Sequence, residues 1–159
     1  MYFWKIDNLK KDLINNAVSE NDQFKYIFVF SICSSIVYIL TSFPFYHQIE
    51  NDIWDVYSAI IESGISILGT YYIFKINGGS NGNYFLQRYF SLSWVIGIRL
   101  SPFILLAIFV FGMLSIGFGF DDALDDIFFN LGLFSFILIY YWLVGKHTKE
   151  VTLKSKNSK

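Results

Sequence analysis

Four hydrophobic stretches follow one another along the chain, and each is long enough to form a membrane-spanning helix. Their approximate boundaries are 26–43, 53–74, 92–117 and 124–144. A bilayer core about 30 Å thick requires about 20 apolar residues at a helical rise of 1.5 Å per residue. The pattern therefore predicts an all-α, polytopic membrane protein in which 25–145 form a four-transmembrane-helix bundle.

A polar segment precedes the first hydrophobic stretch and another follows the fourth. Apolar side chains in 1–24 recur at helical spacing: Tyr2, Ile6, Leu9, Leu13 and Ala17. This spacing predicts an amphipathic helix, whose apolar face either lies on the cytoplasmic leaflet or packs on the protein's own loops or on a second copy. Residues 146–159 are expected to form a basic, mobile cytoplasmic tail.

The distribution of basic residues predicts the orientation. Eleven of the twelve Lys and Arg residues fall in the amino-terminal flank, in the link between the second and third stretches, or in the tail. The other two loops, 44–52 and 118–126, contain no Lys or Arg. The positive-inside rule therefore places both termini and the central link in the cytoplasm. The short-looped build favours a bacterial inner (plasma) membrane.

The third stretch allows two interpretations, because Tyr89–Phe120 is too long for one upright span. In the first, the helix is continuous and tilted, and Arg99 lies about 15 Å deep. In the second, 101–120 form the span, and Arg99 snorkels at the inner boundary. Pro102 is a kink in the first interpretation and an early-turn residue in the second. The continuous, tilted helix is favoured.

Glu62 and Arg99 are charged residues placed well inside hydrophobic stretches. Charges at membrane depth are costly, so they mark either a functional site or a structural pair. The two residues lie at similar distances from the central link, which predicts an interior Glu–Arg pair between neighbouring antiparallel helices. A structural pair that fixes the register of the helices is favoured over a conduction or proton-transfer site.

Two further groups of polar residues are candidate sites. Glu62 belongs to a polar stripe that must face protein or water: Asp55, Ser58, Ser66 and Gly69. An outer acidic cluster lacks any Lys or Arg: Glu50, Asp52, Asp121, Asp122, Asp125 and Asp126. This cluster would concentrate cations at a pore mouth. Helix capping, together with the absence of bases that the topology already demands, is the favoured explanation, and the spacing does not match a calcium-binding loop.

Composition removes several classes of function. Charged residues make up 16% of the chain and the net charge is −1, so no basic field points to nucleic acid. His47 and His147 are predicted on opposite sides of the membrane, and Cys33 is the single cysteine. No catalytic constellation, metal site or cofactor motif follows from these residues. We therefore do not expect an enzyme.

Two functions remain. The first is a small integral membrane protein that self-assembles as a homo-oligomer and acts as an ion-conducting or membrane-perturbing effector. Four spans alone seldom enclose a pore, so several copies would have to surround it. The alternative is a non-conducting membrane partner, such as a sensor, immunity or defence-accessory subunit. Such a partner would bind a cytoplasmic protein through the N-terminal helix or the basic tail.

Overall fold

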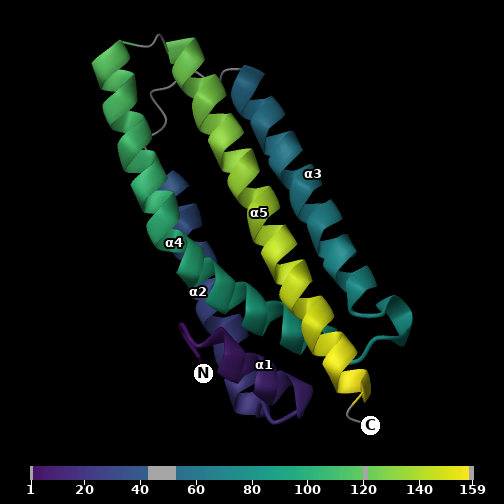
Figure 1. Cartoon of the computed structure of the whole chain (residues 1–159). Coiled ribbons are helices and arrows are strands. Elements are labelled where there is room, and N and C mark those ends of the chain that lie inside the picture. The colour runs from purple at the N-terminus through teal and green to yellow at the C-terminus, as the bar shows by residue number, and fades with distance from the viewer. Residues whose placement is uncertain (1, 43–52, 120–121, 158–159) are drawn as a thin grey trace.

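The computed structural model describes residues 2–42, 53–119 and 122–157. This part of the chain is all-helical, with 88% helix and no strand. Its elements, in chain order, are α1 (Ile6–Ile14), α2 (Glu20–Ser42), α3 (Ile53–Ile76), the short 3-10 helix η1 (Gly79–Asn81), α4 (Phe85–Phe118) and α5 (Asp122–Asn157) (Figure 1). The predicted all-α class is confirmed.

Three of the described helices, α3, α4 and α5, are long and apolar enough to cross a membrane. They contain the second, third and fourth hydrophobic stretches of the sequence, so these three stretches form helices with the length and apolar composition that a membrane span requires. The first stretch lies in α2 as far as Ser42, and the side chains of α2 beyond Cys33 fall outside the described part.

Helix α5 lies between α3 and α4, and α2 packs against α4 (Figure 1). Helices α3 and α5 run in the same direction, and α4 runs opposite to both. The helices therefore do not pack in the order in which they follow one another along the chain.

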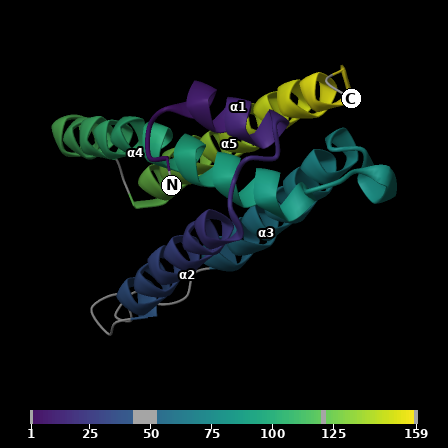
Figure 2. The same ribbon diagram turned by 90° about the horizontal axis from the view of Figure 1, so that it is seen from below.

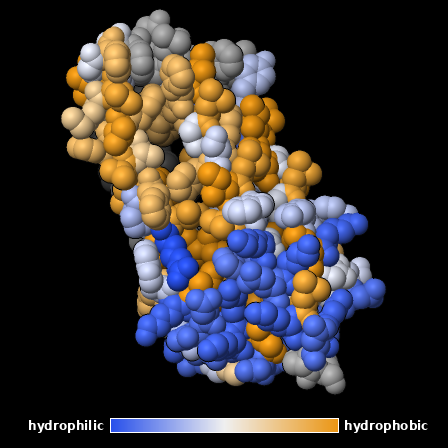
Figure 3. Space-filling view, viewed as in Figure 1, coloured by the Kyte–Doolittle hydropathy of each residue, from blue (hydrophilic) through white to orange (hydrophobic). Residues whose placement is uncertain are grey.

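The molecule has a polar end, where its core lies, and an apolar part (Figure 3). The polar end is built from three segments: 2–26, 73–100 and 140–157. Every buried residue among those described lies in this end, within 6–26, 73–96 and 144–152. The apolar part, consisting of 57–72, 101–119 and 127–139, leaves most of its large hydrophobic side chains exposed. Such a surface requires a lipid or protein environment.

Helix α1 lies across α4 and α5 at the polar end (Figure 2). Its apolar residues Ile6, Leu9 and Leu13 are buried there, which confirms the amphipathic helix and shows that it packs on its own protein. The Lys10 ammonium contacts the Glu150 carboxylate of α5 at 2.9 Å. Burial lowers the pKa of Lys10, but hydrogen bonds to Glu150 and Asp7 outweigh this effect and hold the pKa above its usual range.

The expectation of a mobile tail is wrong, because α5 continues through it to Asn157. Val151 and Thr148 in this segment are fully buried. Helix α1 packs against α5, so the segment gains a folded partner that a solvated tail would lack. Its Lys residues do not prevent folding, since only one face of a helix has to be buried.

Helix α4 is continuous through Pro102, as the favoured interpretation predicted. Proline has no N–H, so it cannot donate to the carbonyl of Ile98 one turn earlier. The hydroxyl of Ser101 donates to that carbonyl at 2.9 Å. A serine hydroxyl can satisfy a backbone group freed by proline inside a membrane helix, so the helix continues. Helix α4 changes direction between its lower and upper parts (Figure 1).

Candidate functional site

Arg99 lies at the boundary between the polar end and the apolar part. Its guanidinium donates to the carbonyl oxygen of Trp4 from Nε, at 2.9 Å, and from Nη2. The same guanidinium lies 5.8 Å from the centroid of the Trp4 ring. The buried residues of α4 end at Ile96. Arg99 therefore occupies the boundary position of the second interpretation, although the helix is continuous as in the first.

The structure does not bring Glu62 and Arg99 together, which corrects the predicted interior pair. Helix α5 packs between α3 and α4, and Arg99 is bonded to Trp4 instead. Similar distances from the central link give two residues similar depth, but contact also requires that the two helices adjoin at that depth. Trp4 is far from Arg99 in sequence, and no periodicity links them.

Glu62 lies on the face of α3 that is turned toward α5. Ser58, four residues earlier, lines a groove shared with α5, and Gly69, seven residues later, lies against Tyr141 of α5. Residues at this spacing share one face of a helix, so Glu62 lies between them along the α3–α5 seam. Its side chain is half-buried, and within the described residues it forms no hydrogen bond or ion pair.

The groove lies where α3 and α5 begin, and its volume is about 170 Å³. Two polar side chains, Ser58 and Asn130, are set among apolar ones: Tyr57, Ile61, Ile127, Leu131 and Phe134. These residues place the groove one to three helical turns inside the ends of α3 and α5. The groove is thus the part of the seam between those ends and Glu62.

The backbone brings part of the acidic cluster to the same end of the seam. Asp55 lies in the first turn of α3, and Asp122, Asp125 and Asp126 lie at the start of α5. The side chains of these four residues are outside the described part, as are Glu50, Asp52 and Asp121 entirely. Because α3 and α5 are parallel neighbours, their acidic first turns lie at one end of the molecule (Figure 1).

Toward the polar end, two tyrosines close the seam. A Cβ atom on Gly69 would lie 2.5 and 2.8 Å from the Cδ1 and Cδ2 atoms of Tyr141. A Cβ atom on Gly145 of α5 would lie 2.9 Å from Cε1 of Tyr72 on α3. Each helix therefore provides a glycine that accommodates a tyrosine of the other. The role of Gly69 in the predicted stripe is therefore steric, because it permits the close approach of Tyr141.

Ser66 is the stripe residue that lies elsewhere. It lines a second groove on the flank of α3, together with Phe85 of α4. The stripe read from the sequence therefore divides in the structure. Ser58, Glu62 and Gly69 face α5, whereas Ser66 belongs to a different surface.

The polar end holds a buried polar cluster that the sequence did not reveal. Arg88 is 4% exposed, and its Nη1 donates to Oδ1 of Asn77 at 3.0 Å and to Oγ1 of Thr152 at 3.1 Å. The Asn77 side chain donates to the carbonyl of Asn83 at 3.2 Å. These bonds join the end of α3, the start of α4 and the end of α5. In the sequence, Arg88 is simply a basic residue of a short link.

No protein-family model, curated protein or solved structure matches this chain. The site consists of the Glu62 carboxylate in the described apolar part, with the groove of Ser58 and Asn130 before it along the α3–α5 seam and the contact between Gly69 and Tyr141 beyond it. Ionisable residues at membrane depth mark ion or proton pathways when they face the interior of a bundle.

Proposed function

We propose that the chain is a four-span membrane protein that assembles with copies of itself and conducts cations along the α3–α5 seam. In this proposal 26–43 form the remaining span, and the polar end with both termini faces the cytoplasm of a bacterial cell. The observation that carries the proposal is Glu62, a half-buried carboxylate in the apolar part with no partner among the described residues.

The depth of Glu62 supports this role. At 1.5 Å per residue, Glu62 lies about 14 Å from the start of α3 and about 20 Å from Lys75. These distances place it near the middle of a bilayer core about 30 Å thick. An unpaired charge at that depth is costly unless water or a cation reaches it. A cation that neutralises Glu62 removes that cost, which makes the residue a binding position along a path.

The ends of the seam support a direction for the path. Acidic first turns attract cations and raise their local concentration at the outer mouth. The groove containing Ser58 and Asn130 lies next along the seam, and its lining reaches Ile61, the residue before Glu62. Beyond Glu62, Tyr141 against Gly69 closes the seam within one copy. Conduction therefore requires that assembly or movement separates α3 from α5 at this contact.

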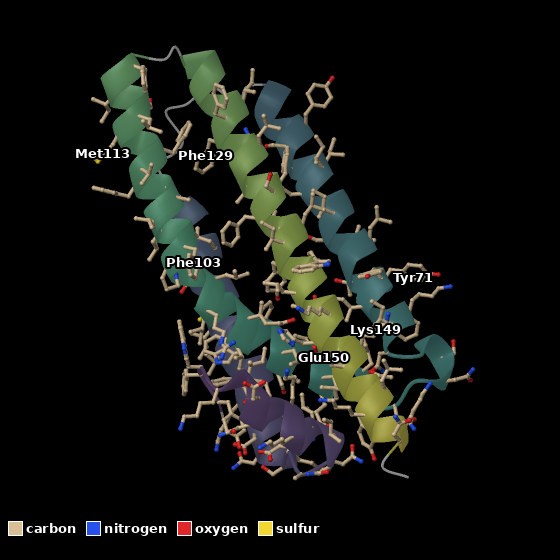
Figure 4. All side chains as sticks on the ribbon, viewed as in Figure 1. Tyr71, Phe103, Met113, Phe129, Lys149 and Glu150 are labelled. Atoms are coloured by element: carbon tan, nitrogen blue, oxygen red, sulfur yellow. The ribbon has the colours of Figure 1, made fainter. Side chains whose placement is uncertain are left out.

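The exposed face of α4 offers a surface for assembly. Phe103, Phe109, Met113 and Ile116 are all exposed on this helix, and Met113 points away from the other helices (Figure 4). In a bilayer this face meets either lipid or the same face of another copy. The proposal predicts that copies associate through it.

Flux of K⁺ from liposomes containing the purified chain tests the conducting function. We expect flux in the wild type, a large loss with Glu62→Gln, and retention with Glu62→Asp, which keeps the charge. Glu150→Gln removes a carboxylate at the polar end and serves as the matched control. Absence of flux together with a monomer in native lipid would contradict the proposal and favour the non-conducting partner.

Topology is tested independently by reporter fusions. A reporter active only outside the cytoplasm should be active when fused after His47 and inactive when fused after Lys149. The opposite pattern would contradict the orientation. Activity at both positions would contradict the four-span arrangement.

A further inference from the structure

Three pairs of an aromatic ring and a basic side chain lie near the boundary between the polar end and the apolar part. The Nζ atom of Lys75 is 5.4 Å from the centroid of the Tyr71 ring, and that of Lys146 is 5.5 Å from the centroid of the Trp142 ring. The third pair is Arg99 with Trp4.

In the first two pairs the ring precedes the lysine by four residues, about one helical turn. Because α3 and α5 both run toward the polar end, each lysine follows its aromatic residue in the direction of that end (Figure 1). Aromatic rings at headgroup level with lysines extending toward water are typical of a membrane interface. The two lysines are therefore at the level where lipid phosphates lie.

One of these pairs borders a groove on the flank of α3. The groove is lined by Ser66, Ile67, Thr70, Tyr71 and Phe74 of α3 and by Phe85 of α4. The hydroxyls of Thr70 and Tyr89 are hydrogen-bonded to each other at 3.2 Å, so the Thr70 hydroxyl already has a partner. Tyr71 is both a wall of the groove and the ring beneath Lys75, and it points outward from α3 (Figure 4).

We infer that this groove binds one acyl chain of an anionic phospholipid, with the lipid phosphate at the Lys75 ammonium. The apolar walls fit a hydrocarbon chain, and Lys75 supplies the complementary charge at the end of the groove where a headgroup would lie. Helix α3 has no acidic residue between Glu62 and its last residue, Ile76, so no carboxylate on this helix competes for Lys75. The inference requires membrane insertion and does not require conduction.

Lipid retention measured by native mass spectrometry tests the inference. The full chain in mild detergent is offered equal amounts of phosphatidylglycerol and phosphatidylcholine with identical acyl chains. We expect the wild type to retain phosphatidylglycerol preferentially. Lys75→Gln should reduce this preference about fivefold, the effect of one basic residue at a membrane surface. Lys75→Arg should preserve it, and Lys11→Gln, which removes an equal charge on α1, should leave it unchanged.

A second pair of variants tests the groove. Ile67 and Leu68 are exposed to nearly the same extent, 69% and 68%, but only Ile67 lines the groove. Ile67→Trp should fill the groove and abolish retention of both lipids, whereas Leu68→Trp should not.

Equal retention of the two lipids by the wild type would overturn the inference. It would also be overturned if Lys75→Gln behaved like Lys11→Gln, or if the two tryptophan variants behaved alike. Dimers lost with Ile67→Trp, without any change in bound lipid, would show that a second copy occupies the groove instead. Neither lipid result changes the expected K⁺ flux, so failure here is distinct from failure of the proposed function.

Discussion

Gly69 is the position where α3 makes room for the Tyr141 ring of α5, and its replacement by alanine tests the seam directly. The added Cβ atom would lie 2.5 Å from Cδ1 and 2.8 Å from Cδ2 of the ring. Ordinary carbon–carbon contacts are about 3.5–4.0 Å, so the atoms have to separate by about 1 Å. The overlapping atoms lie at the base of the ring, so rotation of the ring about its Cβ–Cγ bond does not remove the overlap.

The expected cost can be separated from the effect of alanine on the helix. Inserting a methyl group into a well-packed contact typically costs about 1–3 kcal/mol. Replacing glycine by alanine inside a helix gains about 1 kcal/mol. Gly64→Ala brings the same gain on the same helix, and nothing lies within 4 Å of its Cβ position. The difference between the two variants is therefore the steric term alone, about 1–3 kcal/mol.

Thermal unfolding in detergent, followed by loss of the monodisperse peak in size-exclusion chromatography, measures this difference. For a chain of this size, 1 kcal/mol corresponds to about 2–4 °C in Tm. Gly69→Ala should therefore unfold about 2–12 °C below Gly64→Ala, and Tyr141→Ala in the same chain should remove most of the gap. Equal Tm values for the two alanine variants would refute the close α3–α5 contact.

Three further changes test the polar end and α4. Asn77→Ala removes an acceptor from the buried Arg88 guanidinium and should cost about 1.5–3 kcal/mol of unfolding free energy. Asn81→Ala, at an exposed position, should be neutral. Equal effects of the two variants would contradict the buried cluster. Ser101→Ala should cost about 1 kcal/mol because it leaves the Ile98 carbonyl without its hydroxyl. Adding Pro102→Ala should restore the loss by supplying an N–H, and simple additivity would argue against this compensation. Lys10→Gln should cost less than about 1 kcal/mol at pH 7. Because the Lys10 pKa is raised, its contribution is complete at neutral pH and is lost as the pH rises through that pKa. A Tm difference between wild type and Lys10→Gln that grows as the pH rises above 7 would contradict this assignment.

The sequence predicted correctly those features that depend on the residues of a single helix. Apolar runs predicted the helices that contain 53–74, 92–117 and 124–144, since the length of an uncharged run directly reflects bilayer thickness. The spacing of Ile6, Leu9 and Leu13 predicted the buried face of α1. Both features depend on local periodicity, which one segment of sequence contains in full.

The sequence was uninformative where the result depends on which helices are neighbours. The Glu62–Arg99 pair assumed that α3 and α4 pack together along their length, whereas their contacts lie near the central link, as between Thr70 and Tyr89. Hydrophobic runs look the same in either arrangement. The buried position of Arg88 and the folded end of α5 depend on contacts between segments distant in sequence. The role of Gly69 was also hidden, because the sequence alone cannot distinguish a glycine in a polar stripe from a glycine that permits a close helix contact.

The reversal potential of the reconstituted protein tests the central claim most directly. In planar bilayers with a tenfold KCl gradient, a cation-selective path through Glu62 should give a reversal potential near the K⁺ limit of about 59 mV in magnitude. Glu62→Gln should move this potential toward zero, and Glu62→Asp should not. A wild-type reversal potential at zero, or one that Glu62→Gln leaves unchanged, would contradict the assignment of Glu62 to a cation path.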